Sequence, residues 1–99
     1  MTTALPIFKT QSVATGAAAL AGAAGKRRLM GVLLFGGSAN SQVEFKDAAT
    51  DTGTVLLSVN VLANDTKFMD LISLGGLLFN TGLFVKPAGT GAIAYVWYE

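Results

Sequence analysis

The 99-residue chain contains no histidine and no cysteine. Without them it has no imidazole base, no Ser-His or Cys-His nucleophile pair, and no nitrogen or sulfur ligand for a metal ion. The absence of cysteine also excludes a disulfide framework and fits synthesis in a reducing cytoplasm. Catalysis would have to rest on carboxylates and lysine, and the sequence predicts a protein that is not an enzyme.

Charged residues are also scarce. They make up 13% of the chain, hydrophobic residues make up 52%, and the net charge is only +1. A balance so close to neutral gives no general electrostatic attraction to nucleic acid. The longest apolar run, 29–35, is far shorter than the roughly 20 residues of a spanning helix, so we expect no membrane contact. Small chains leave much surface exposed, and this apolar excess predicts partners that cover part of it.

Glycine and turn residues divide the chain into short β-strand candidates. Residues 42–46 alternate cleanly between polar and apolar, so Val43 and Phe45 are expected to face a core. Other apolar runs of strand-like composition follow at regular spacing; they are 28–35, 54–62, 77–79, 83–85 and 92–98. Six to eight short strands at this spacing predict an all-β fold, an antiparallel β-sandwich or jelly-roll-like domain.

The N-terminal region gives a weaker pattern. Residues 1–13 contain few apolar side chains, and we expect an extended N-terminal arm or edge strand ahead of a single β-sandwich domain at 14–99. For 14–25, loop with some strand is favoured over helix, because each of its three glycines costs about 1 kcal/mol in a helix. Residues 68–74 fit either a short helical turn or an extended crossover.

The last strand candidate has two apolar faces. At period two, one side carries Ile93, Tyr95 and Trp97, and the other carries Ala92, Ala94, Val96 and Tyr98. A single sandwich core covers only one side of such a strand, so we expect the chain itself or another protein to cover the other. The predicted interface residues are Ile93, Tyr95, Trp97 and Tyr98, together with Phe8 and the basic group Lys26, Arg27 and Arg28.

The C-terminal aromatic residues are interpreted as core or interface anchors, with a sugar-stacking platform as the alternative. Replacing a buried tryptophan by alanine costs on the order of 3–5 kcal/mol, whereas a solvated turn aspartate contributes less than about 1 kcal/mol. Trp97→Ala is therefore expected to be far more damaging than any replacement of an acidic residue.

Two polar segments also have competing interpretations. The basic group 26–28 fits a solvated start of a strand, and the alternative is an ion-pairing anchor against an acidic neighbouring subunit. Gly36-Gly37-Ser38 follows an apolar strand as a phosphate-binding loop would, but it lacks the required Lys-Ser/Thr pair. We expect a hairpin turn there.

The acidic residues are expected to cap turns. Asp47 and Asp51 lie in one polar segment and would be close enough for a calcium site or an acid/base pair, but the segment lacks the dense oxygen-ligand spacing of a calcium loop. Asp65 and Asp70 are assigned to turns for the same reason. The sequence predicts neither a metal nor a cofactor.

The order of segments from Leu29 onward resembles a known class of proteins. A strand ending in Gly-Gly-Ser precedes the polar strand 42–46 and the segment 52–57, Thr-Gly-Thr-Val-Leu-Leu. Residues 75–85, Gly-Gly-Leu-Leu-Phe-Asn-Thr-Gly-Leu-Phe-Val, then lead to a final Ala-Tyr-Val-Trp-Tyr strand. This order resembles small virion structural proteins of tailed bacteriophages, among them capsid decoration (cement) proteins.

The resemblance implies a structural role in a virion, after synthesis in the host cytoplasm. It implies a capsid decoration protein that assembles as a homotrimer and bridges the major capsid protein, or another virion protein, without a cofactor. A tail, neck or head-fibre component is the alternative within the class. From other classes, a carbohydrate-binding host-recognition module is the next alternative and a carboxylate enzyme the last.

Overall fold

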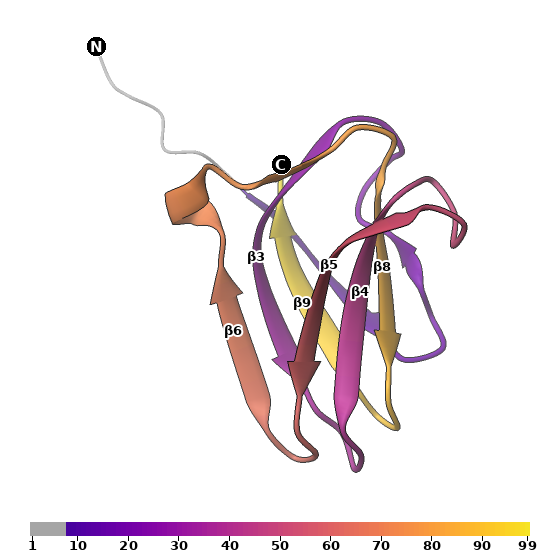
Figure 1. The fold of residues 1–99 in the computed structure, drawn as a ribbon, viewed down its shortest axis with the longest axis vertical. Coiled ribbons are helices and arrows are strands. Elements are labelled where there is room, and N and C mark those ends of the chain that lie inside the picture. The colour runs from indigo at the N-terminus through magenta and orange to yellow at the C-terminus, as the bar shows by residue number, and fades with distance from the viewer. Residues whose placement is uncertain (1–7) are drawn as a thin grey trace.

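The structure, a computed structural model, describes residues 8–99 as two antiparallel β-sheets packed face to face (Figure 1). The elements in this part of the chain are β1 (Lys9–Ala14), β2 (Ala19–Leu20), β3 (Arg27–Phe35), β4 (Ser41–Asp47), β5 (Thr54–Val61), β6 (Thr66–Asp70), the 3-10 turn η1 (Ile72–Leu74), β7 (Leu77–Phe79), β8 (Leu83–Ala88) and β9 (Ile93–Tyr98). The predicted all-β antiparallel sandwich is confirmed, with nine strands within residues 8–99 rather than six to eight.

The first sheet has the order β1-β9-β3-β6, with β7 also paired to β3, and the second has the order β2-β8-β4-β5. Figure 1 shows β6, β3 and β9 in one layer and β5, β4 and β8 in the other. Only the connections from β4 to β5 and from β6 to β7 stay within one sheet. No helix within residues 8–99 has the length and hydrophobicity needed to span a membrane.

Alternating side chains fill the space between the two sheets. In β4, Val43 and Phe45 are fully buried, as the alternation of the sequence predicts, while Gln42 and Glu44 are only partly buried. Every other strand except β2 and β6 also contributes one or more buried residues. The buried core is Val13, Ala21, Leu29, Val32, Leu34, Val43, Phe45, Val59, Val61, Leu71, Phe79, Leu83, Val85, Ala94, Val96 and Tyr98.

The terminal strand β9 has one face in this core and one face outside. Ala94, Val96 and Tyr98 are 0%, 0% and 5% exposed, whereas Ile93 and Trp97 are half-buried on the opposite face. The expected division into two apolar faces is confirmed. The expected large effect of Trp97→Ala assumed that Trp97 is buried, and this assumption needs correction. Tyr98 is the aromatic residue of β9 in the core, and Trp97 lies on the outer face.

A β-bulge in β3 sets this register. Leu29 pairs with Tyr98 and Gly31 pairs with Trp97, so Met30 is an extra residue between the two pairs. An extra residue shifts the alternation of a strand by one position. As a result Leu29 and Val32 both face the core, while Gly31 and the alternate residues that follow it face outward.

β1 forms an edge strand of the first sheet and pairs with β9 along its whole length. Of the expected arm 1–13, residues 1–7 lie outside the described residues, and the rest of the arm from Lys9 onward belongs to the chain's own sheet. The Gln11 side chain donates to the carbonyl of Leu20 at 2.8 Å and accepts from the amide of Gly22 at 3.2 Å. It thereby links this edge to β2 of the second sheet.

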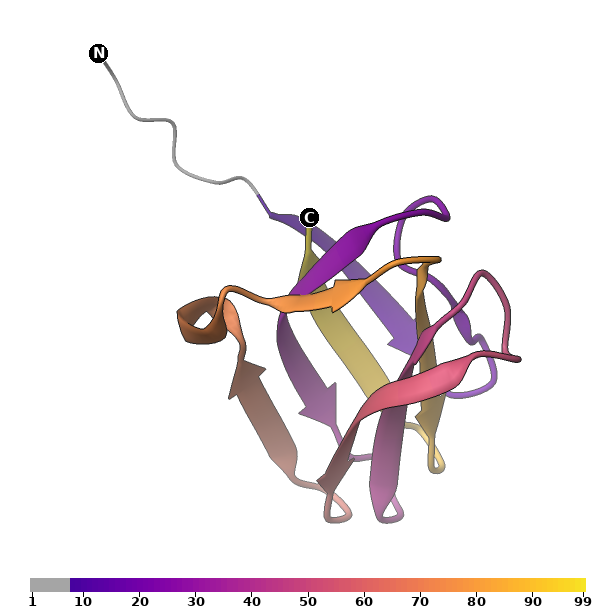
Figure 2. The ribbon, with the colours of Figure 1, turned by 45° about the horizontal axis from the view of Figure 1, so that its top comes forward.

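Residues 14–25 form a turn, the short strand β2 and a series of bends, which confirms the expectation of loop with some strand. Gly22 has a φ of 70°, and a Cβ built there would lie 3.0 Å from Cε2 of Tyr98, so any side chain would have to displace the ring. Residues 68–70 complete β6 and residues 72–74 form η1, so the segment is extended in its first part and a helical turn in its second. Figure 2 shows η1 at the far end of β6, at the side of the molecule.

Phe45→Ala is expected to lower the free energy of unfolding by about 3–5 kcal/mol, because Phe45 is fully buried between the sheets. Trp97→Ala is expected to cost clearly less, because part of the indole ring contacts water. Denaturant unfolding of the two variants measures the difference. An equal or larger loss for Trp97→Ala would place the energetic core of the domain at the outer face and contradict this assignment.

Candidate functional site: the outer face of the first sheet

The two sheets present different outer faces to solvent. On the second sheet the outward positions of β4 and its neighbours are mostly polar, namely Gln42, Glu44, Lys46, Ser58, Asn60 and Lys86. Its exposed apolar residues, Val55 and Leu56, lie beside a bulge near the start of β5. The first sheet reverses this composition, because its outward positions are mostly apolar.

We call the outward apolar side chains of β3, β6 and β9 the aromatic face; they are Leu33, Phe35, Phe68, Ile93, Tyr95 and Trp97. The strand register brings them together, since Leu33 pairs with Tyr95 on one side and with Phe68 on the other. Phe35, Phe68 and Tyr95 are 40%, 61% and 39% exposed. Large aromatic side chains with this much exposure on one face mark a binding surface more often than a plain solvent boundary.

The rings of the aromatic face pack against one another in two edge-to-face pairs. Phe35 and Tyr95 have centroids 5.5 Å apart and planes at 79°, and Phe68 and Trp97 have centroids 6.0 Å apart and planes at 86°. Edge-to-face contacts of this kind stabilise a ring pair by about 0.5–1.5 kcal/mol beyond the area that they bury. The pairs therefore hold the rings in place before any partner binds, which lowers the entropy lost on binding.

A pocket of about 240 Å³ lies at one end of the aromatic face. Its wall and floor are formed by Phe8, Met30, Gly31, Phe68, Asp70, Ile72 and Trp97. The floor is open because residue 31 has no side chain. A Cβ built at Gly31 would lie 3.5 Å from Cε3 of Trp97 and 3.6 Å from the carbonyl oxygen of Met69, which are ordinary contact distances. The pocket can therefore be made shallower without disturbing the strands around it.

Four of the predicted interface residues gather at this face. Ile93, Tyr95 and Trp97 belong to the aromatic face, and Phe8 lines the pocket beside Trp97. Tyr98 does not join them, because its ring lies in the core of the domain.

The predicted basic group lies elsewhere, in a shallow depression that residues 26–28 form with Leu78 and Glu99. The Arg27 side chain donates to the carbonyl of Ala23 at 3.0 Å, and the Arg28 side chain donates to that of Gly75 at 3.1 Å. Both arginines thus support local backbone, which fits the start of a strand, the first of the two interpretations.

The four aspartates bind nearby groups. Asp65 accepts from the amide of Thr66 at 2.8 Å and Asp70 from that of Ile72 at 2.9 Å, as expected of turn aspartates. Asp47 instead accepts from the amide of Thr81 at 2.7 Å, in the turn before β8 and not in its own turn. The bond from Thr81 is the main cause that lowers the pKa of Asp47. Within residues 8–99 no cluster of three or more acidic, histidine or cysteine side chains is placed to hold a metal ion.

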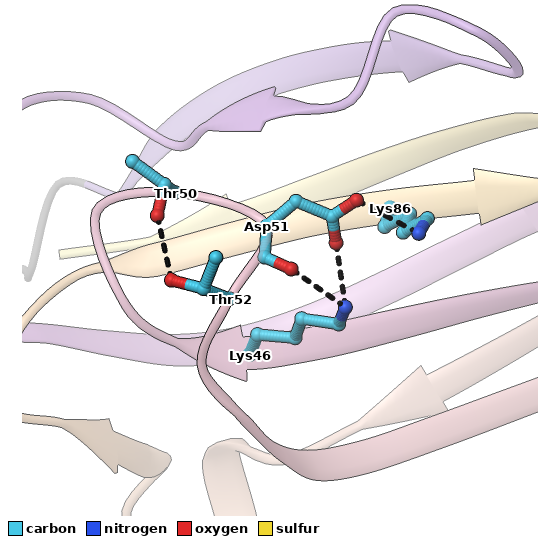
Figure 3. Close-up of polar contacts among 5 residues, drawn as sticks. All are labelled: Lys46, Thr50, Asp51, Thr52 and Lys86. Atoms are coloured by element: carbon cyan, nitrogen blue, oxygen red, sulfur yellow. Dashed lines mark hydrogen bonds and ion pairs between the residues drawn. The ribbon is translucent and has the colours of Figure 1, made fainter.

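Asp51 pairs with two lysines instead of capping its own turn (Figure 3). Its carboxylate oxygens lie 2.5 Å from Nζ of Lys46 and 2.8 Å from Nζ of Lys86. The hydrogen bonds from Lys46 and Lys86 lower the pKa of Asp51, and the bond from Lys46 has the larger effect. The hydrogen bond to Asp51 in turn raises the pKa of Lys86. The ion pairs tie the 48–53 turn to the outer face of the second sheet.

Comparison of the chain with models of known protein families, with curated proteins and with solved structures found no match.

Sequence reasoning missed half of the aromatic face and the floor of the pocket. Leu33 and Phe35 lie in a continuous apolar run, in which period two gives no direction until the bulge at Met30 is known. Phe68 stands between Lys67 and apolar Met69 in β6, so no polar-apolar alternation marks it as an outward aromatic residue. Nothing in the sequence marks Gly31 as the floor of a pocket.

Asp51→Asn is expected to lower stability near neutral pH, with the difference confined to a definite pH window. A lowered pKa means that Asp51 contributes stability above its ordinary value of 3.8, and that the contribution is lost as the pH falls below that value. The raised pKa of Lys86 gives the opposite sign, with the contribution present below its ordinary value of 10.5 and lost above it.

Denaturant unfolding of the parent and Asp51→Asn from acid to alkaline pH tests this expectation. The two curves should separate between the two limits and converge outside them. The gap should also shrink at about 1 M salt, because Asp51 and Lys86 are exposed and their charges are screened. A gap that persists in strong acid would mean that the ion pairs with Asp51 are not its cause.

Proposed function

We propose that this protein is a structural protein of a tailed-bacteriophage virion, a capsid decoration (cement) protein that binds neighbouring subunits through its aromatic face. In this proposal it bridges the major capsid protein and copies of itself, and it catalyses no reaction. It is made in the host cytoplasm and ends in the virion. The resemblance of the segments from Leu29 onward to small virion proteins supplies the class.

The observation that carries the proposal is the contrast between the two outer faces. Three rings of the aromatic face leave roughly 300 Å² exposed, given about 150–250 Å² for an aromatic side chain and their exposed fractions. This is the size of a patch that is often functional on a small protein. The outward positions of the second sheet instead carry ion-paired lysines and polar side chains. Such a molecule has one face suited to contact with subunits and one suited to water.

The packing and hydrogen bonds of the domain also favour a rigid structural subunit. The two sheets bury a continuous core, and the Asp47 and Gln11 side chains fasten turns to strands. The acidic side chains described above are engaged in such bonds, which leaves little for chemistry. Interfaces of long-lived assemblies are rich in aromatic residues and depleted in charge, as the aromatic face is.

A carbohydrate-binding module is the second candidate, and the exposed rings of Phe35, Phe68 and Tyr95 favour it. Sugar recognition needs polar groups around a stacking ring to bind hydroxyls. On the outward positions of β3, β6 and β9 the charged and hydroxyl-bearing side chains are Arg28, Thr66, Asp70 and Tyr95, and Arg28 is bonded to the carbonyl of Gly75. This sparse polar set makes a protein surface the better partner, and a glycan array separates the two candidates.

Phe35→Ser is expected to weaken attachment of the purified protein to particles that lack it by at least tenfold, because it removes one exposed ring of the aromatic face. Leu56→Ser is the matched control, since Leu56 is 41% exposed and Phe35 is 40% exposed, but Leu56 lies on the second sheet. Co-sedimentation with particles measures both variants. Equal effects of the two substitutions, or none, would contradict the proposed role of the face.

Quantitative mass spectrometry of purified virions tests the class of virion protein. A decoration protein covers the shell, so we expect hundreds of copies per particle. A few to tens of copies would instead assign the protein to the tail, neck or head fibre. Absence from the virion would refute the proposal.

A further inference from the structure

We infer that the aromatic face binds a second copy of this chain, with Phe68 of each copy inserted into the pocket of the other. This inference rests on the proposed function, because it names the subunit that the face contacts. Its support comes from the shape, the charge and the area of the face.

The aromatic face has a projecting ring beside a matching pocket. Phe68 is 61% exposed, the largest exposed fraction among the aromatic residues of the face, and it forms one wall of the 240 Å³ pocket. An apolar protein cavity of about 150 Å³ can hold a benzene molecule, so this pocket has room for a phenyl ring. A two-fold axis that lies between two copies and passes beside Phe68 places each ring over the other copy's pocket. Such an interface uses the same patch on both subunits.

The charge of the face also fits a second copy. Identical charged faces would bring like charges together, which costs free energy. Two charged residues occupy outward positions of β1, β3, β6 and β9 within residues 8–99. Arg28 lies at the start of β3, opposite Leu78 of β7, and donates to the carbonyl of Gly75; the other is Asp70. Asp70 lies at the rim of the pocket, where its carboxylate accepts the amide of Ile72. The six residues of the aromatic face themselves carry no charge, so they give a charged partner little to bind and repel their own copy little.

The area of the face sets the expected strength of the pair. With Ile72 at 51% exposed and with the half-buried residues included, the face leaves roughly 500 Å² per copy and roughly 1,000 Å² per pair. This is the lower limit for a specific interface and is typical of weak association. We therefore expect a dimer with a dissociation constant of roughly 1–100 µM. It replaces the homotrimer that the resemblance implies as the contact made by this face, because a two-fold contact of one face with itself closes with two copies.

Sedimentation equilibrium of the full chain from about 1 to 300 µM tests this expectation. Trp97 gives a second, local signal, because it is the only tryptophan and lines the pocket. As Phe68 of the second copy excludes water from the pocket, the fluorescence of Trp97 should move to shorter wavelength over the same concentration range.

Two substitutions probe the ring and the pocket separately. Phe68→Ser should weaken the dimer by at least about 30-fold, because it removes a central ring. Leu62→Ser is the matched control, since Leu62 is 66% exposed but lies in the turn after β5, and it should have no effect. Gly31→Ala should weaken the dimer by about tenfold, because its methyl group fills the floor of the pocket.

Gly31→Ala distinguishes insertion from unspecific association, because it removes no apolar surface. If Phe68→Ser weakens the dimer and Gly31→Ala does not, the insertion is refuted. A dimer insensitive to both substitutions uses another surface and also refutes it. If Phe68→Ser unfolds, Ile72→Ser is measured in its place, since Ile72 lines the pocket from η1, outside the strands.

A parent that stays monomeric at about 300 µM also refutes the inference. Separate outcomes decide whether the proposed function holds. A monomer whose attachment to particles still depends on Phe35 leaves the proposed function in place, with the shell as the partner. A dimer formed through Phe68 that is absent from virions keeps the inference and refutes the proposed function.

Discussion

The pairing of β3 with β9 is the contact on which the rest of the structure depends. These two strands form the middle of the first sheet, and both are apolar on both faces. The extra residue Met30 in β3 fixes which face of each strand turns inward. A slip of one residue would move Tyr98 and Val96 outward and bring Trp97 and Tyr95 against the second sheet. One bulge therefore decides which aromatic residues stabilise the domain and which remain available to partners.

Much of the fold followed from the sequence because alternation and turn residues act locally. The two faces of β9 and the inward side of β4 were both predicted from period two alone. The division of roles between Tyr98 and Trp97 was not, because it depends on the partner strand and on which side the second sheet covers. The candidate site was found only in part for the same reason. Its C-terminal residues were predicted, whereas Phe68 and Gly31 become part of it only through pairing across β3.

The polar residues were predictable where their partners are close in sequence. Asp65 and Asp70 bind amides one and two residues away, as turn-forming aspartates do. Asp47 and Asp51 bind partners from β8 or the turn before it, more than thirty residues away. No local rule predicts those contacts. Through these contacts Asp47 and Asp51 fasten turns to the strands of the second sheet.

The pairing of β1 with β9 has a consequence for how the protein is made. The first sheet needs a strand from the beginning of the described chain and a strand from its end, and β9 separates β1 from β3. While the chain is being synthesised, β1 has no neighbour in its sheet and β3 can pair only with β6 and β7, so the edge of β3 that β9 covers stays open. The sheet can close only after Tyr98 has left the ribosome. Contacts between such distant segments also fold slowly, so the nascent chain passes through a period in which it is prone to aggregate.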